Sequence, residues 1–453
     1  MRSSRFRRAL YHAFRKAEIR RKKSEFTPAG WLLFIAVCAA GLMGLDTTRT
    51  LLYQVFTFLL ALLLLTFAWR FRFRPRLSVK RELPKFGTAG DRLEYRLLIS
   101  NLAAARQVGL SVQEIGDDPC PTLEEFVNTP EPGEERRNPY DRLLMFYRWK
   151  WLVYRKKQAD FAEWPAPPLP RRAETDMRVA VTPLRRGYLR LTGLRVIRCD
   201  PFNLCKAFCD FPREDRVLIL PKRYALPPFA LPGARKFKRG GVALASSVGE
   251  SEEFVALRDY RPGDPLRHIH WKSWAKVGKP IVKEYQDEYF VRHALVLDTF
   301  QQAAYTDVFE EAVSVAASFA CVVRTQDSLL DLMFVGPEAY CFTAGRSLSH
   351  TEQMLEILAS VKICSDKPFS ALPPMIFERA EMLSGCICIL LAWDAERRKF
   401  IETLRGFGLP LLVFVVTGAE NRQAVEREAA QNTSPHFLEV GQIQEGLNLL
   451  NVR

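Results

Sequence analysis

Thr50–Trp69 reads TLLYQVFTFLLALLLLTFAW, a stretch of the sequence without a charged residue. A helix needs about 20 predominantly apolar residues to cross the ~30 Å hydrocarbon core of a bilayer, because each residue adds only about 1.5 Å. Such a long charge-free run is unusual for a helix of a soluble protein, which normally has a polar face. The stretch therefore predicts a membrane-spanning helix, and the rest of the fold is inferred outward from it.

A second apolar segment, Phe26–Leu45, precedes this stretch and is weaker, because glycines dilute its hydrophobicity. The residues between the two segments, 46–49, are too few for anything but a tight turn. A secretory signal peptide would have a shorter apolar core and a small-residue cleavage site, and the second apolar run argues against one. Rather than buried core helices, we predict a two-helix transmembrane hairpin over 26–69, with helices at 26–45 and 50–69.

The positive charge of the chain is concentrated around these segments. The net charge is +15, and residues 1–81 contain seventeen Lys or Arg against three acidic residues, so the remainder is close to neutral. Basic residues fill the N-terminal 1–25 and follow the second segment at 70–81, which places both ends in the cytoplasm by the positive-inside rule. We therefore expect a multi-pass protein of the lipid bilayer. A nucleic-acid-binding domain would carry its own basic field, so no nucleic acid is expected as a partner.

Cysteine usage agrees with a cytoplasmic location. The chain has ten cysteines, several of them in apolar, strand-like runs. Free cysteine behaves as a small buried hydrophobe and stays reduced in the cytoplasm. Cys199, Cys205 and Cys209 lie close in sequence, but they form no CxxC pair and have no His nearby, so they do not predict a zinc site.

After the hairpin the sequence has the character of β structure. Residues Arg92–Ile99 nearly alternate apolar and polar side chains, as a half-buried strand does. Similar strand character recurs in Gln107–Ile115, Thr175–Thr182 and Gly187–Arg198. We therefore predict a β-sandwich-like domain over residues 76–220, with an insertion at 116–172.

The middle of that insertion, Tyr140–Lys157, is both aromatic and basic. Such a segment can lie at a membrane interface, with its rings at headgroup level and its cations near anionic lipid. It can equally form a helix or hairpin that covers the sandwich, with its aromatic rings buried and its basic stems extended to solvent. Of the two, we favour the covering helix.

From about Phe290 strands and helices alternate. His293–Asp298 is an apolar strand that ends in an acid, and Asp307–Val323 repeats apolar residues at helical spacing. Further strands are predicted at Leu329–Val335, Tyr340–Thr343, Cys386–Ala392 and Leu409–Val416, and a helix at Leu348–Val361. This alternation predicts a doubly wound α/β domain over 290–453, whose mainly parallel sheet is covered on both faces.

In such sheets ligands bind at the carboxyl ends of the strands. Asp298 and Asp394 each follow a predicted strand and are the positions where chemistry is plausible. The sequence has no GxGxxG or GxxxxGK[ST] loop and no GxSxG elbow. We therefore predict no catalytic residues and no cofactor.

Residues 221–289 form a linker and a signature segment between the two domains. Gly249–Glu288 reads GESEEFVALRDYRPGDPLRHIHWKSWAKVGKPIVKEYQDE and mixes acidic, basic, His and Trp side chains densely. Burying unpaired charges is costly, so the segment resembles a surface built for charge pairing. Pro262-Gly263 suits a type II turn, and Asp264-Pro265 suits the first two positions of a short helix.

This segment resembles the signature of a bacterial family called domain of unknown function fifty-eight. The family pattern S-x-E-F-x-x-L-R-x-Y-x-x-G-D-x-x-R-x-I-x-W-K-x-x-A stands here as Ser251, Glu253, Phe254, Leu257, Arg258, Tyr260, Gly263, Asp264, Arg267, Ile269, Trp271, Lys272 and Ala275. A second family element, R-R-G-x-[YF] followed by D-P-F-G-L, is similar to Arg185–Tyr188 and Asp200–Leu204, with Asn203 in place of the usual Gly.

The resemblance implies an inner-membrane protein whose C-terminal domain, 290–453, is similar to von Willebrand factor A domains. Those domains often bind a divalent cation through D-x-S-x-S at the end of the first strand. Here the corresponding run is Asp298-Thr299-Phe300-Gln301-Gln302, so both serines are replaced, one by an aromatic residue that cannot ligate. Because Mg²⁺ needs several oxygen ligands, we predict no metal site.

The signature segment has two interpretations. It is either a charged clasp between the two domains or a docking surface for a partner protein, in which Trp and Arg are the usual anchors. The residues expected to carry either role are Glu253, Arg258, Tyr260, Asp264, Arg267, His270, Trp271 and Lys272.

Two function classes follow. The preferred one is a membrane-anchored, cytoplasm-facing interaction or scaffold protein without enzymatic activity. The family resemblance implies a MoxR-type AAA+ ATPase and other von Willebrand factor A-like proteins as partners, in protein maturation or cell-envelope processes. The alternative is a hydrolase-like enzyme with a site near Asp298, Asp394 and the 258–272 part of the signature.

Overall fold

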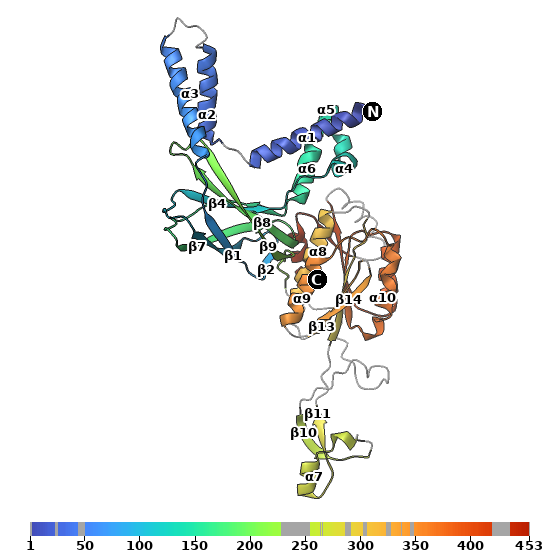
Figure 1. Ribbon diagram of the computed structural model, residues 1–453. Coiled ribbons are helices and arrows are strands. Elements are labelled where there is room, and N and C mark those ends of the chain that lie inside the picture. The colour runs from blue at the N-terminus through green and yellow to red at the C-terminus, as the bar shows by residue number, and fades with distance from the viewer. Residues whose placement is uncertain are drawn as a thin grey trace. The chain divides into compact units, whose positions relative to one another are not determined.

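The structure is a computed structural model that describes residues 2–22, 26–43, 50–227, 254–262, 264, 266–285, 291–301, 306–322, 328–336, 338–344, 348–418 and 435–452. The chain divides into two compact units, Met1–Leu220 and Pro221–Arg453. Each unit is described by itself (Figure 1). The predicted 46–49 turn lies outside the described residues.

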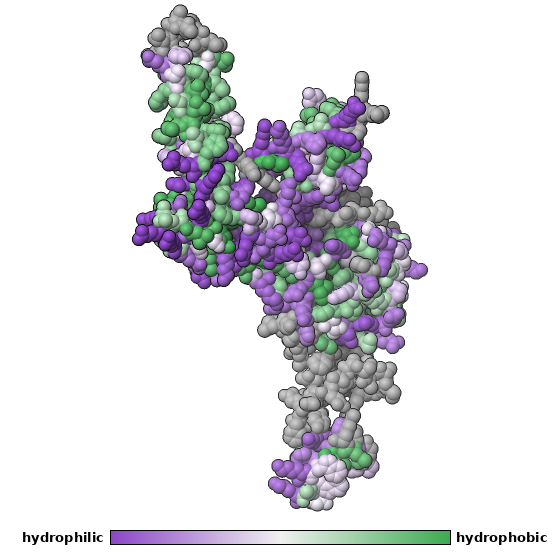
Figure 2. Space-filling model, viewed as in Figure 1, coloured by the Kyte–Doolittle hydropathy of each residue, from purple (hydrophilic) through white to green (hydrophobic). Residues whose placement is uncertain are grey.

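The first unit begins with the helices α1 Arg2–Lys22, α2 Pro28–Met43 and α3 Thr50–Arg70. Among the described residues, α3 is the one helix long and apolar enough to cross a membrane, whereas α2 is apolar but shorter. The two helices lie side by side, and Gly41 of α2 faces the ring of Phe56 on α3. Figure 2 shows an apolar column along both helices, and their outward side chains include Leu32, Leu42, Phe58 and Leu65, each more than 60% exposed.

Two β-sheets form the body of the first unit. The antiparallel sheet β1-β3-β7-β5 contains Leu77–Glu82, Leu93–Asn101, Glu174–Pro183 and Ala159–Phe161. The second sheet, β2-β9-β8-β4-β6, contains Phe86–Thr88, Lys206–Leu220, Gly187–Cys199, Leu110–Gly116 and Glu163–Pro165. Alternating apolar residues of both sheets, such as Leu97 and Ile99 from one and Leu191 and Ile219 from the other, share one core. Each predicted strand of this region overlaps an observed one.

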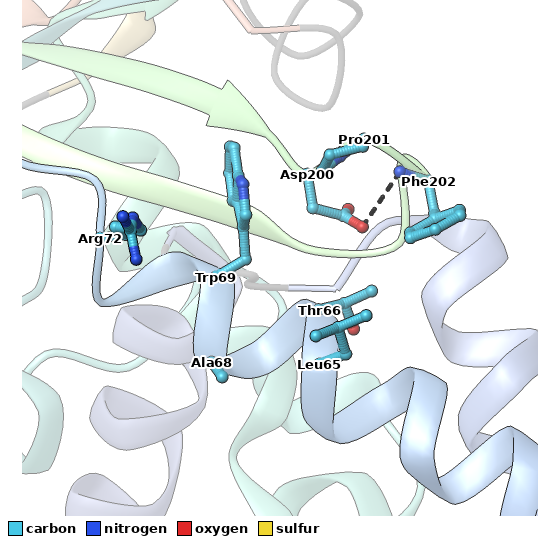
Figure 3. Close-up of a pocket in the computed structure, with 8 residues that line it drawn as sticks. All are labelled: Leu65, Thr66, Ala68, Trp69, Arg72, Asp200, Pro201 and Phe202. Atoms are coloured by element: carbon cyan, nitrogen blue, oxygen red, sulfur yellow. Dashed lines mark hydrogen bonds between the residues drawn. The ribbon is translucent and has the colours of Figure 1, made fainter.

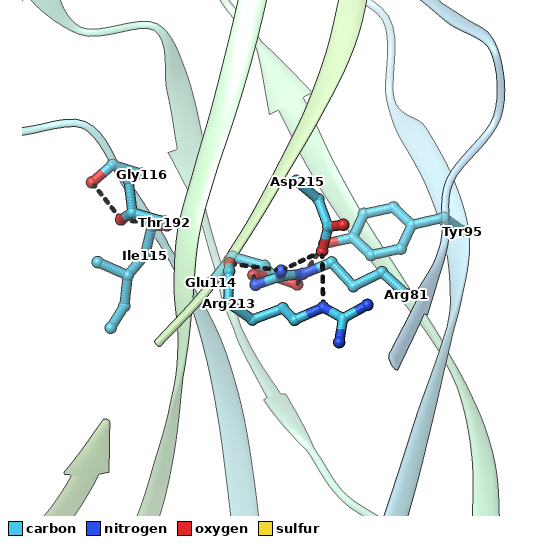
Figure 4. Close-up of polar contacts among 8 residues, drawn as sticks. All are labelled: Arg81, Tyr95, Glu114, Ile115, Gly116, Thr192, Arg213 and Asp215. Atoms are coloured by element: carbon cyan, nitrogen blue, oxygen red, sulfur yellow. Dashed lines mark hydrogen bonds and ion pairs between the residues drawn. The ribbon is translucent and has the colours of Figure 1, made fainter. Parts of the chain in front are cut away.

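A buried polar network joins the two sheets (Figure 4). Arg81 of β1 donates to both oxygens of Glu114 on β4, at 3.0 and 2.7 Å, and to Asp215 on β9 at 2.7 Å. The hydroxyl of Tyr95 on β3 donates to Glu114 at 2.6 Å. Burial and the adjacent Glu114 carboxylate raise the pKa of Tyr95, which keeps its hydroxyl protonated as a donor. Because every charge has a partner, the network fixes the registry of the sheets at a tolerable desolvation cost.

The insertion forms the short helices α4 Leu123–Asn128 and α5 Pro139–Leu144, the 3₁₀ turn η1 Glu134–Arg136 and the helix α6 Phe146–Lys156. The buried face of α6, Trp149 and Leu152, packs with Phe126 of α4 and Tyr11 of α1 in a cluster separate from the sandwich core. The prediction of a helix was right, but the prediction that this helix covers the sandwich was wrong. The sequence reading of 1–25 as a basic tail missed the aromatic residues of α1 that complete this cluster.

The second unit contains a mixed six-stranded sheet in the order β14-β13-β12-β15-β16-β17. Its strands are β12 Val291–Leu297, β13 Ser328–Val335, β14 Ala339–Ala344, β15 Gly385–Leu390, β16 Leu411–Thr417 and β17 His436–Glu439. All neighbours pair in parallel except the edge strand β14, which is antiparallel to β13. Each predicted strand of this region overlaps an observed one, and β17 was not predicted.

Helices cover both faces of this sheet (Figure 1). On one face, the 3₁₀ turn η5 Phe369–Ala371 and the helices α10 Pro373–Phe377 and α11 Ala395–Gly406 bury residues such as Ile376 and Phe400 against Val296 and Cys388. On the other face lie α8 Asp307–Val322 and α9 Leu348–Ser360, where Phe319 of α8 meets Phe414 of β16 with ring centroids 5.1 Å apart. The 3₁₀ turn η6 Ala380–Met382 precedes β15, and α13 Ile443–Asn448 and η7 Leu449–Val452 follow β17.

Candidate functional site

The signature segment folds into a small module (Figure 1). Strand β10 Phe254–Asp259 pairs antiparallel with β11 Ile281–Tyr285, and the chain between them forms the 3₁₀ turn η3 Leu266–His268 and the helix α7 Trp271–Val277. Within the described side chains of this module, the buried apolar residues are Ile269 and Val282, which meet through an isolated β-bridge. An isolated two-stranded hairpin is marginally stable at best.

An ion pair shapes the loop that follows β10. The guanidinium of Arg258 donates to both carboxylate oxygens of Asp264, at 2.7 and 2.8 Å, and the backbone N–H of Arg261 donates to the same carboxylate at 2.8 Å. The hydrogen bond from Arg258, followed by that from Arg261, lowers the pKa of Asp264 to about 2. A bidentate pair also fixes geometry, so Arg258 and Asp264 hold the course of this loop.

Helix α7 carries an aromatic pair, in which Trp271 is exposed and Trp274 is half-buried. The indole rings of Trp271 and Trp274 stack with centroids 5.2 Å apart at 17°, and Trp271 is 64% exposed. His270 precedes the helix, and its Nδ1 lies 2.7 Å from the hydroxyl of Ser273. The same module also exposes the apolar side chains of Leu257, Leu266 and Val277. Exposed aromatic and aliphatic side chains beside arginine are typical of protein-binding surfaces.

The remaining predicted signature residues are placed as follows. The backbone N–H of Tyr260 donates to the carbonyl of Pro280 at 3.0 Å, which ties the loop to the approach of β11. Lys272 is exposed on α7. Arg267 lies in η3 with its side chain outside the described part, and Glu253 lies outside the described residues altogether.

The short helix predicted to begin at Asp264-Pro265 is present only as the 3₁₀ turn η3 Leu266–His268, and Pro265 itself lies outside the described residues. The Asp264 carboxylate is occupied by Arg258 and Arg261, and α7 begins only at Trp271. Between them the chain makes a 3₁₀ turn and then places Ile269 in a bridge to Val282. That bridge is a tertiary contact, which local helix signals do not report.

The second candidate region is the carboxyl edge of the six-stranded sheet. Asp298 directly follows β12, and Asp394 caps the N-terminus of α11 after the neighbouring strand β15. Asp298 is fully buried and accepts from the backbone N–H groups of Phe300 and Leu391, both at 3.0 Å. The two carboxylates predicted to stand at strand ends therefore do so at the same edge of adjacent strands.

The positive charge beside these carboxylates is the guanidinium of Arg397. Nε of Arg397, in the first turn of α11, donates to Asp298 at 2.6 Å, and the same guanidinium pairs with Asp394 and donates to the carbonyl of Phe300 at 3.2 Å. It also lies 4.6 Å from the centroid of the Phe369 ring. Burial alone would lower the pKa of Arg397, and the Asp298 carboxylate raises it above its ordinary value.

These residues do not fit the divalent cation that the family resemblance would suggest. Both oxygens of the Asp298 carboxylate already accept hydrogen bonds, from an internal guanidinium and two backbone N–H groups, and Phe300 contributes a ring where a hydroxyl would ligate. Among the described residues there is no group of three or more His, Cys, Asp or Glu side chains that could hold a metal ion, and Gln302 lies outside them. All ten cysteines are free.

Sequence reasoning missed Arg397. A signal was present, because Asp394 and Arg397 are three positions apart, a spacing at which an acid and a base can pair across one helical turn. What the sequence could not report is that the other end of the same guanidinium reaches Asp298, 99 positions earlier.

Comparisons with known proteins match part of the chain. Residues 256–378 match the family model described as protein of unknown function DUF58, which begins in the signature module and continues into the α/β domain. A curated relative, the uncharacterized protein YeaD of Bacillus subtilis, is 26% identical over 187 residues, which are 41% of this chain and 45% of that protein. The chain thus matches less than half the length of that relative.

Solved structures add little. A CARDB domain from Pyrococcus furiosus, solved with di-metal ions, is 13% identical, covers 32% of this chain and 89% of its own, and has a TM-score of 0.17. A GH20 exo-β-N-acetylglucosaminidase from Vibrio harveyi is 9% identical, covers 76% of this chain and 57% of its own, and has a TM-score of 0.13. At such TM-scores neither likeness bears on the fold or the function of this chain.

Proposed function

We propose that this chain is a membrane-anchored interaction protein whose signature module, residues 254–285, docks a partner protein in the cytoplasm. The observation that carries the proposal is the exposed Trp271, stacked on Trp274, on a module whose loop is held by the Arg258–Asp264 pair. Aromatic and arginine side chains of this kind supply most of the energy of protein interfaces. The hairpin of β10 and β11 supports the same conclusion, because a two-stranded hairpin is marginally stable by itself and a partner would add stabilising contacts.

The anchor in this proposal is a hairpin of α2 and α3. Supporting it are the packing of Gly41 against Phe56, the outward apolar side chains of both helices, and the arginines that follow α3. With both helices across the bilayer, the N-terminus and the large C-terminal region share the cytoplasmic side. If α3 alone crossed, the two ends would lie on opposite sides.

Topology reporters separate these arrangements. A reporter fused after Arg453 and one placed before α1 should both report the cytoplasm, and one inserted in Asp46–Arg49 should report the other side. Opposite readings from the two ends would show a single crossing and refute the hairpin.

The α/β domain in this proposal is similar to von Willebrand factor A domains. Support comes from the sheet order, which corresponds to 3-2-1-4-5-6 with an antiparallel third strand, and from Asp298 at the end of the first strand. This domain would not bind its partner through a shared metal, since Arg397 occupies the place of the cation. The enzyme alternative gains no support here, because both Asp298 oxygens already accept hydrogen bonds from Arg397 or the backbone.

The family resemblance makes a MoxR-type AAA+ ATPase the partner that we propose, in protein maturation or cell-envelope processes. The test is capture of partners by the full chain from detergent-solubilised membranes, with mass spectrometry to identify them. An AAA+ ATPase should be captured by the wild type and lost with Trp271→Ala. Truncated anchors of this kind typically cost about 2 kcal/mol or more in binding.

Tyr188→Ala is the matched control, because Tyr188 is a similarly exposed aromatic residue of the first unit, at 61%. The same variants are melted by circular dichroism. If Trp271→Ala lowers thermal stability while capture per folded molecule persists, the module is an interdomain clasp and the docking role is refuted.

A further inference from the structure

The turn between β8 and β9 forms a pocket with the end of α3. The pocket has a volume of about 340 Å³, and its apolar lining includes Leu65, Ala68 and Trp69 of α3 and Pro201 and Phe202 of the turn, with Arg72 at its side. Figure 3 shows the residues of α3 and of the turn that line the pocket. This turn is the Asp200–Leu204 element that the sequence singled out, and nothing in the docking proposal uses it.

Internal hydrogen bonds make the turn rigid. The carboxylate of Asp200 accepts from the backbone N–H groups of Phe202, Leu204 and Cys205, at 3.2, 2.6 and 2.7 Å. Asn203 has a φ of 55°, a left-handed conformation that Gly and Asn adopt most readily. This explains why Asn can stand where the resembling family usually has Gly.

The turn is also tied to the start of α2. The backbone N–H of Thr27 donates to the carbonyl of Leu204 at 3.0 Å, and its hydroxyl donates to the carbonyl of Asn203 at 2.6 Å. A Cβ on Gly30 would collide with the carbonyl oxygen of Leu204, so only Gly permits this approach. The turn that forms the pocket wall is therefore fixed against the start of α2 and faces α3, so the pocket has a defined shape.

The electrostatics of the pocket favour an anion. Its one acid, Asp200, is 4% exposed, and its carboxylate faces three backbone donors inside the turn. On the outside, Arg72 is exposed at the pocket, and Arg198 lies 5.2 Å from the centroid of the Trp69 ring. The sequence around Arg72 is RFRFRPR, with basic residues at 70, 72, 74 and 76. An apolar floor beneath an arginine suits a ligand with both a phosphate and a hydrocarbon chain.

We propose that this pocket binds one anionic phospholipid, with its phosphate on Arg72 and an acyl chain against Leu65, Ala68 and Phe202. The proposal rests on the membrane anchor, because the end of α3 would then lie where hydrocarbon gives way to headgroups. Trp69 suits that depth, since indoles concentrate at the interface, and the 56% exposed Phe202 would reach the acyl region from the turn.

The test is lipid retention by the full chain, purified in mild detergent, supplied with equimolar phosphatidylglycerol and phosphatidylcholine, and measured by native mass spectrometry. The wild type should retain one phosphatidylglycerol in preference to phosphatidylcholine. Arg72→Ala should lower this preference about fivefold, the effect expected for one basic side chain at an anionic lipid. Phe202→Ala should weaken retention of both lipids.

Two matched controls define the site. Arg74→Ala removes an arginine of the same exposed stretch, and Phe71→Ala removes a ring that is 68% exposed, and neither residue lines the pocket. Both should retain phosphatidylglycerol as the wild type does. Equal losses in Arg72→Ala and Arg74→Ala would show diffuse attraction to the basic stretch and overturn the pocket.

Two further measurements separate this proposal from the others. Millimolar inorganic phosphate should not displace the lipid, because it lacks the acyl chain, and displacement would overturn the acyl contacts. Resistance of the chain to carbonate extraction tests the anchor itself. A chain that resists extraction yet shows no lipid preference refutes the lipid site alone, whereas a chain that is extracted refutes the anchor and the lipid site together.

Discussion

Two Arg–Asp pairs of the second unit have the same chemistry and opposite surroundings. In the pair at the sheet edge, the side chains of Arg397 and Asp298 are 8% and 0% exposed, and in the pair of the signature module those of Arg258 and Asp264 are 33% and 16% exposed. The buried pair fills the edge at which an α/β sheet ordinarily binds ligands. The partly exposed pair holds a loop in a module that also exposes apolar side chains such as Leu266 and Trp271. The burial of an ion pair therefore decides its role. The buried pair occupies a potential ligand site, whereas the partly exposed pair orders a loop on the surface.

The largest expected effect comes from breaking the buried pair. Arg397→Ala leaves the Asp298 carboxylate buried with only two backbone donors, and an uncompensated buried charge costs about 3–5 kcal/mol. We expect a large loss in the free energy of unfolding, measured by denaturant titration of the full chain in detergent. A loss no larger than that of a surface substitution would contradict the described burial.

A double variant shows whether the charge or the packing causes that loss. Asp298→Asn combined with Arg397→Met removes both charges and keeps similar volumes. We expect it to be clearly more stable than Arg397→Ala alone, since no buried charge then lacks a partner. If it is as unstable as the single variant, the packing of Arg397 on Phe369 dominates instead.

The next largest difference between the two regions is expected in how their stability depends on pH. Burial lowers the pKa of His293, which lies on β12, the strand that Asp298 follows. Because a depressed histidine pKa means that the unfolded chain binds more protons, stability falls as the pH drops below the ordinary value of about 6.5. The Arg258–Asp264 pair should persist to much lower pH, since its stabilisation is lost only as the pH falls from the ordinary Asp range toward about 2.

The measurement is the melting temperature of the full chain between pH 8 and pH 5. We expect a decrease across that range that is largely absent in His293→Gln, which has no group to protonate. An unchanged pH dependence in the variant would assign the effect to another histidine.

Local periodicity accounts for most of what the sequence predicted. The strands of the six-stranded sheet are apolar on both faces and bounded by helices of period 3.6, so β12, β13, β15 and β16 were found with errors of one to a few residues at their ends. The edge strand β17, His436–Glu439, was missed because its four residues are too short for a pattern.

What local patterns could not report were contacts between distant residues. The role of the aromatic residues of α1 depends on such a contact, because Tyr11 is buried against Phe126 and Trp149, which lie far from it in sequence. Arg397 was missed as the partner of Asp298 for the same reason, and the short helix of the signature segment ends at His268, just before Ile269 bridges to Val282. The signature residues themselves were found, because their charge and indole content is unusual before any contact is known.

A smaller effect is expected on stability when the exposed pair is broken. Arg258→Ala leaves Asp264 near solvent and still hydrogen-bonded by Arg261, so the melting temperature of the full chain should change little. Arg258→Lys, which keeps the charge but loses the bidentate fork, serves as the matched variant. Should Arg258→Ala destabilise the chain as strongly as Arg397→Ala, the module would be an integral clasp and the contrast between the two pairs would fail.

The smallest effect is expected from divalent metal. A ligand that binds the folded state raises stability in proportion to the logarithm of its concentration over its dissociation constant. Mg²⁺ requires several oxygen ligands, but the Asp298 carboxylate is taken by Arg397 and two backbone donors, and Phe300 offers none from its side chain. Millimolar Mg²⁺ or Mn²⁺ should therefore leave the melting temperature of the wild-type chain unchanged. A clear rise that disappears in Asp298→Asn, while an equal concentration of Na⁺ has no effect, would show that the metal displaces the guanidinium and that this edge of the sheet is open after all.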